Sequence, residues 1–100
     1  MSELDARLAD LAARGEVVSY GALAADLGWR MAELTAALEA TMEADTAAGR
    51  PLRAAICRTK VGEGLPARGF FDKAAALGHD LGDPAAFVAQ QRAGLFKREL

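Results

Sequence analysis

The chain has 100 residues, of which 52% are hydrophobic and 26% are charged, with one cysteine and a formal net charge of −2. This length and composition suit one packed domain over residues 1–100 and exclude a disordered segment. The small negative charge excludes a uniformly basic nucleic-acid-binding protein, and a single cysteine excludes an intrachain disulfide. With no basic, apolar leader and no run of membrane-spanning length, we expect a cytoplasmic domain.

Three helices are predicted in the first half of the chain, over residues 3–14, 20–27 and 31–48, and each is followed by a glycine. Ser2 and Ser19 stand where N-cap residues belong. Apolar side chains recur at helical spacing in all three segments and are expected to face the core. This inward set is Leu4, Leu8, Leu11, Tyr20, Leu23, Ala24, Leu27, Met31, Leu34, Leu38 and Met42.

The second half of the chain is predicted to hold a strand, an exposed loop and two further helices. Residues 52–58 favour a strand, and the glycines and Pro66 of residues 59–69 indicate a hairpin loop. A short helix is expected over residues 72–77. An aspartate followed by a proline then begins the last helix, over residues 84–98.

The order of these elements is that of a winged helix-turn-helix domain. We expect a mostly α fold with a small β hairpin. Residues 1–71 would form the winged-helix core, and residues 72–100 would form a C-terminal helical extension.

Residues 17–25 (Val-Val-Ser-Tyr-Gly-Ala-Leu-Ala-Ala) resemble the start of the C-terminal winged-helix domain of alkylguanine-DNA alkyltransferases and alkyltransferase-like proteins. In those proteins a recognition helix and a hydrophobic strand follow, and the strand ends in Pro-Cys-His-Arg before a glycine-rich wing. Here Ile56 precedes Cys57, and Arg58 and Thr59 follow it. The resemblance therefore implies a winged-helix fold and DNA contact through the wing, without alkyl transfer.

A second resemblance is carried by residues 49–52 (Gly-Arg-Pro-Leu) and residues 64–70 (Gly-Leu-Pro-Ala-Arg-Gly-Phe), with the predicted strand between them. This pattern is similar to that of small winged-helix modules in bacterial proteins of unassigned or restriction-linked function. It implies the same architecture and names no activity.

Charge is segregated along the sequence. Residues 1–49 carry three basic and nine acidic side chains, whereas residues 50–73 carry six basic and two acidic ones. A basic segment of this kind favours salt-dependent contact with nucleic-acid phosphates, so DNA is the expected partner. The candidate nucleic-acid-binding residues are Arg30, Arg53, Arg58, Lys60 and Arg68.

The acidic side chains of the predicted third helix favour a different function. Carboxylates repel phosphates, so this helix is unsuited to reading bases in the major groove. The alternative function is therefore a protein-interaction module or small adaptor subunit that uses the acidic third helix. Self-association between the acidic and basic parts, giving a homodimer or a longer assembly, is a third possibility.

No catalytic or metal-binding constellation is visible in the sequence. Cys57 has no histidine within sequence reach, so it is expected to be a buried structural thiol. His79 stands beside Asp80 without further residues at ligand spacing, which favours a surface histidine. We therefore expect no enzyme activity, no cofactor and no metal.

Overall fold

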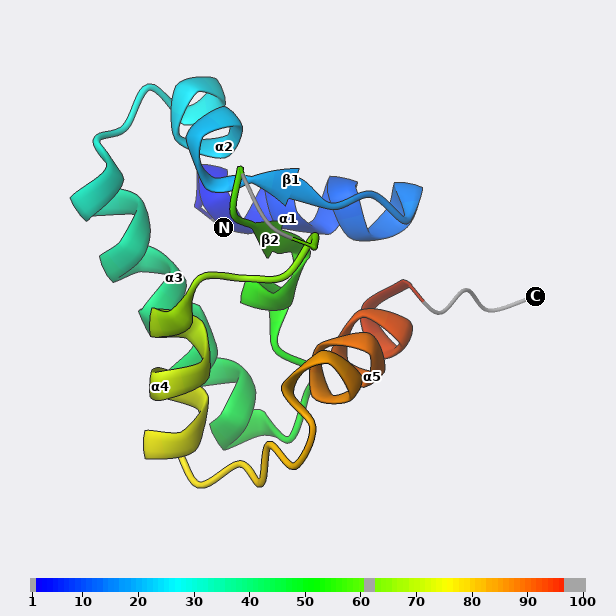
Figure 1. Ribbon diagram of the computed structural model, residues 1–100. Coiled ribbons are helices and arrows are strands. Elements are labelled where there is room, and N and C mark those ends of the chain that lie inside the picture. The colour runs from blue at the N-terminus through cyan, green and yellow to red at the C-terminus, as the bar shows by residue number, and fades with distance from the viewer. Residues whose placement is uncertain (1, 61–62, 97–100) are drawn as a thin grey trace.

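The computed structural model describes residues 2–60 and 63–96, and these form five α-helices, a short 3₁₀ helix and two two-residue strands (Figure 1). None of the described helices is long and apolar enough to cross a membrane. In chain order the elements are α1 (Glu3–Arg14), β1 (Val18–Ser19), α2 (Tyr20–Leu27), α3 (Met31–Ala48), η1 (Arg53–Ile56), β2 (Cys57–Arg58), α4 (Arg68–Ala76) and α5 (Pro84–Phe96).

The first three helices form where the sequence predicts them. Each ends at a glycine, and the first two begin at a serine that caps the helix. The Asp5 N–H donates to the Ser2 hydroxyl at 3.1 Å, and the Ala22 N–H donates to the Ser19 hydroxyl at 3.2 Å. Each bond satisfies one of the amides that a helix N-terminus leaves unpaired. Gly28 ends α2 with φ of +69°, a left-handed conformation that glycine adopts without steric cost.

Most of the predicted inward residues are buried, but the prediction for Met31 is wrong. Leu34, Leu38 and Met42 are almost fully buried along α3, whereas Met31 is 48% exposed. The buried side chains of α3 begin at Leu34, on the part of the helix against which η1 and α4 pack. Met31 is the first residue of α3 and lies outside the part of the helix against which η1 and α4 pack.

The two strands form a parallel pair, in which Val18 aligns with Cys57 and Ser19 aligns with Arg58. The mostly α class is therefore confirmed, but the described residues contain no β hairpin. After β2 the chain forms a loop instead, closed by the Thr59 N–H donating to the Leu65 carbonyl at 3.0 Å. Residues 61–62 of the predicted hairpin lie outside the described residues.

The predicted strand over residues 52–58 is mostly 3₁₀ helix, and only Cys57–Arg58 is extended. The Ala55 N–H donates to the Leu52 carbonyl at 3.0 Å, which closes the 3₁₀ turn. The prediction failed because the turn is held by a side chain on another element, described next. The later helix boundaries also differ, since α4 begins at Arg68 and not at 72, and α5 is described as far as Phe96. The remainder of the predicted last helix, to residue 98, lies outside the described residues.

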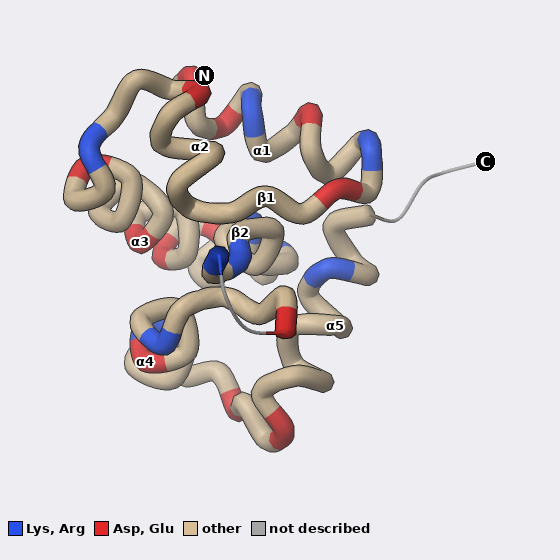
Figure 2. The backbone as a smooth tube through the Cα atoms, turned by 45° about the horizontal axis from the view of Figure 1, so that its top comes forward, with Lys and Arg blue, Asp and Glu red and all other residues tan. Residues whose placement is uncertain are grey.

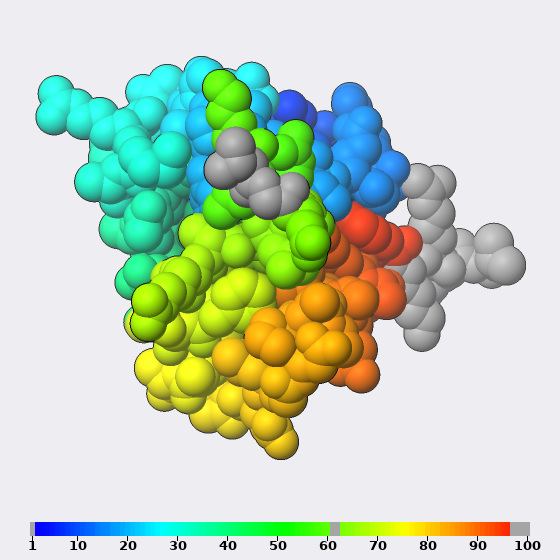
Figure 3. Space-filling view, viewed as in Figure 1, coloured from blue at the N-terminus to red at the C-terminus, as the bar shows by residue number. Residues whose placement is uncertain are grey.

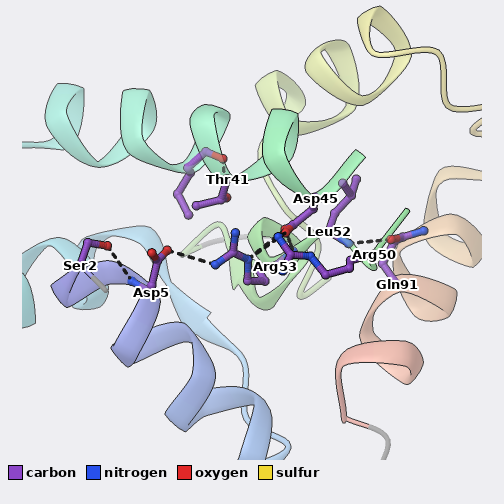
Figure 4. A network of polar contacts seen from close by, with 9 residues as sticks. Ser2, Asp5, Thr41, Asp45, Arg50, Leu52, Arg53 and Gln91 are labelled. Atoms are coloured by element: carbon purple, nitrogen blue, oxygen red, sulfur yellow. Dashed lines mark hydrogen bonds and ion pairs between the residues drawn. The ribbon is translucent and has the colours of Figure 1, made fainter. Parts of the chain in front are cut away.

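A buried carboxylate joins three segments of the chain (Figure 4). Asp45 of α3 is 0% exposed and accepts bonds of 3.0 Å from both the backbone N–H and the Nε–H of Arg53. Arg50 lies 3.2 Å from the same carboxylate, and Arg53 reaches Asp5 of α1 at 3.1 Å. The network fixes η1 between the end of α3 and the start of α1.

Polar contacts also bind α5 to the rest of the fold. The Gln91 side-chain carbonyl accepts from the Leu52 N–H at 2.8 Å. Arg92 donates to the carbonyls of Ala55 at 2.7 Å and Gly64 at 2.8 Å. Helix α5 therefore satisfies backbone groups on both sides of β2 and is an integral part of the domain.

Replacing Asp45 with alanine should lower the free energy of unfolding by about 1–3 kcal/mol, because the backbone N–H of Arg53 would lose its buried acceptor, while the Arg53 guanidinium would keep Asp5 as a partner. Urea unfolding followed by circular dichroism measures this change. Asp26→Ala is the matched control, since it removes an exposed ion pair with Arg7 and should cost less than about 1 kcal/mol. Similar losses in the two variants would contradict the role assigned to Asp45.

Candidate functional site

A hollow of about 480 Å³ lies between α2, α3, the loop after β2 and the start of α4. Figure 3 shows the face on which α3, the residues after β2 and the start of α4 meet. The hollow is lined mainly by apolar side chains, among them Leu38, Met42 and Phe70, with Glu39 and Lys60 as its charged residues. Its volume lies within the range that is usual for binding pockets.

Tyr20 holds two walls of this hollow together. Its hydroxyl accepts a hydrogen bond from the Ala67 N–H at 3.0 Å, which joins α2 to the residue before α4. Burial is the main cause that raises the pKa of Tyr20 to about 12. The hydroxyl therefore stays protonated and acts as a neutral positioning group.

Three of the five predicted nucleic-acid-binding residues are exposed and lie at positions around the hollow. Lys60 lines it directly, Arg30 precedes the lining residue Met31, and Arg68 lies between two lining residues. The Arg68 side chain is 93% exposed, with Asp72 at 3.8 Å. Figure 2 shows basic residues at the start of α3, near β2 and on α4. These three cations come from three separate segments of the chain, and of the three only Lys60 lines the hollow itself.

The other two predicted residues make contacts within the protein. Arg53 binds Asp45 and Asp5, and the hydrogen bond to Asp45 is the main cause that raises the pKa of Arg53. Arg58 is half-buried and donates to the Thr59 carbonyl at 3.2 Å. Nothing in the sequence around Arg53 and Arg58 indicates that these arginines bind within the protein, whereas Arg30 and Arg68 are exposed.

Two of the acidic side chains on α3 stabilise the protein itself. The Glu33 carboxylate accepts from the Arg30 N–H at 3.0 Å, at the start of the helix. Glu43 binds the Lys73 ammonium of α4 at 2.6 Å, and this bond raises the pKa of Lys73. Glu39 is the acidic residue of α3 that lines the hollow.

Cys57 is fully buried in β2, as its sequence context predicts. Burial raises its pKa from 9.0 to about 12, although the positive charge of Arg92 acts in the opposite direction. The thiol is therefore protonated at neutral pH and is a poor nucleophile.

His79, expected at the surface, is half-buried instead. Its Nε2 atom lies 2.8 Å from the Thr46 hydroxyl, and its ring packs against Phe87 with 5.7 Å between the ring centroids. Residues 2–60 and 63–96 contain no group of three or more His, Cys, Asp or Glu side chains that could hold a metal ion.

Comparisons with protein-family models, curated proteins and solved structures found no match to this chain. The function is therefore inferred from the residues and geometry of the hollow.

Stability should fall as pH rises from about 9 to 12. Cys57 ionises near 9.0 when unfolded but near 12 when folded, so the unfolded chain binds fewer protons in this range. Tyr20 acts in the same direction, because its pKa is raised from 10.0 to about 12. Urea unfolding at a series of pH values measures the slope, and Cys57→Ala should make it shallower. A free energy of unfolding that is constant from pH 9 to 11 would contradict the raised pKa values of Cys57 and Tyr20.

Proposed function

We propose that this chain is a non-catalytic DNA-binding domain of the winged-helix type, and that it contacts backbone phosphates. The observation that supports the proposal is that Arg30, Lys60 and Arg68 are exposed and either line one hollow, as Lys60 does, or directly adjoin a residue that lines it. Helices α2 and α3 pack against each other across a glycine turn, as a helix-turn-helix requires. In this proposal the loop after β2, which carries Lys60, takes the role of a wing.

The charges favour contact at the ends of elements and not along α3. Arg30 stands at the N-cap of α3, and Arg68 is the first residue of α4. Glu39, further along α3, would repel phosphates that approached the middle of the helix. We therefore propose that DNA binds through cations at the start of α3, in the loop and at the start of α4, with little reading of base sequence.

Protein binding is the second candidate function, and the hollow itself favours it. Its lining is predominantly apolar, and Met31 at its edge is an exposed large hydrophobic side chain. Exposed apolar surface of this kind is typical of protein-interaction sites.

Lys60→Ala and Arg68→Ala should each weaken binding to duplex DNA of random sequence. Each should also reduce the slope of log K against log salt concentration by about 0.9, because each lost phosphate contact releases one cation fewer. Fluorescence anisotropy titrations at several salt concentrations measure both quantities.

Arg14→Ala is the matched control for these titrations. Arg14 is an exposed arginine on α1, with 59% of its side chain accessible, and it does not line the hollow. It should leave the affinity and the salt slope nearly unchanged. Equal effects of all three variants would indicate only a response to net charge, and absence of binding by the unaltered protein at low salt would overturn the DNA proposal.

A further inference from the structure

The hollow follows one face of α3 for about three helical turns. Its lining residues on this helix recur at the spacing of a single face, and they are Met31, Thr35, Leu38, Glu39 and Met42. From the first of these residues to the last the helix rises by about 16 Å. Helix α2, the loop after β2 and the start of α4 form the other walls. The hollow is therefore an apolar groove whose length suits a short helical segment.

The groove is open toward the start of α3. At the other end of that helix, Lys73 of α4 bonds Glu43 at 2.6 Å, so α4 is held against α3 there. Near the start of α3, Thr35 is exposed and Met31 is 48% exposed. Exposed apolar surface beside a groove of this kind is typical of a site that binds another protein.

The exposed charges at this open end are basic. Arg30 and Lys60 are exposed, and neither forms an ion pair with another residue among 2–60 and 63–96. Arg68 is 93% exposed, and its nearest carboxylate oxygen, on Asp72, is 3.8 Å away. These cations can therefore pair with carboxylates of a partner at little cost in broken contacts.

The acidic residue of the groove, Glu39, interacts with its own chain. Its side chain is half-buried. The hydrogen bond to Glu43 is the main cause that raises the pKa of Lys73, and the negative charge of Glu39 adds to the effect. Part of the charge of Glu39 is thus balanced within the protein, whereas the exposed charges at the groove or beside it are mostly positive.

We propose that this groove binds an acidic, amphipathic helix of a partner protein. The apolar side chains of that helix enter the groove, and its carboxylates meet Arg30, Lys60 and Arg68. The apolar contacts provide most of the affinity, and the cations select acidic partners over basic ones. Because the groove is short, the dissociation constant should be on the order of 10 µM.

This inference rests on the second candidate function, protein binding, and does not require that the domain binds DNA. Duplex DNA could use the same three cations, but its phosphates cannot fill the apolar groove. A domain that binds both would therefore bind them in competition.

Isothermal titration calorimetry of the whole chain with three synthetic peptides tests the inference. The first peptide has about 15 residues, with leucines at positions i, i+4 and i+7, glutamates on the remaining faces and alanines elsewhere. The second has lysines in place of the glutamates, and the third has alanines in place of the leucines. The first should bind, and more weakly as salt rises. The other two should each bind about tenfold more weakly or worse.

Two variants separate this groove from DNA binding. Met31→Ser removes an apolar group without a change of charge, so it should weaken the first peptide by about fivefold or more and leave the affinity for duplex DNA unchanged. Lys60→Ala should weaken both. Ala9→Ser and Arg14→Ala, at exposed positions of α1, are the matched controls and should weaken neither. Native circular dichroism verifies that each variant is folded.

Amide NMR shifts on addition of the first peptide should concentrate at Thr35, Lys60 and Gly69. Shifts confined to another face, equal binding of the acidic and basic peptides, or no effect of Met31→Ser would each overturn the inference. The same shifts on concentrating the protein alone would mean that a second copy fills the groove, and would also overturn it.

The two proposals can fail separately. Binding of duplex DNA without binding of any peptide would overturn this inference and leave the DNA proposal intact. Binding of the acidic peptide without binding of DNA would support this inference and overturn the DNA proposal.

Discussion

The carboxylate of Asp45, at the C-terminal end of α3, is fully buried and is tolerated there because protein donors satisfy it. The backbone N–H of Arg53 is one of these donors, so the chain must turn back along α3 soon after the helix ends. This turn is η1, and it delivers Cys57 beside Val18 to form the parallel strand pair. The buried carboxylate of Asp45 thus helps to position the sheet and the loop that carries Lys60.

The first three helices could be predicted from the sequence because their signals are local. The serines that begin α1 and α2, the glycines that end all three helices and the leucines at helical spacing all act within the segment that they define. The strand pairing could not be predicted in this way, because Val18 and Cys57 are separated by two helices. The 3₁₀ helix was missed for the same reason, since Asp45 stabilises it from a different element.

The sequence shows which residues of the candidate site are charged, but it does not show which of these side chains are exposed and able to bind a partner. The sequence identified five basic residues, yet Arg53 is bound by Asp45 on the preceding helix and by Asp5 on α1, 48 residues away in the chain. Arg68 has no such buried partner and remains 93% exposed. The hollow itself depends on the tertiary contact between Tyr20 and Ala67. No periodicity in the sequence encodes that contact.

Arg92 constrains the order in which parts of this domain can fold. Its guanidinium lies in α5, but it bonds the carbonyls of Ala55 and Gly64, which flank β2 and its loop. During synthesis those carbonyls emerge well before Arg92 does, and they must remain hydrated until it arrives. The Gly64 carbonyl of the loop after β2 therefore gains its protein donor only when the last described helix docks, although Gly64 precedes that helix in the chain.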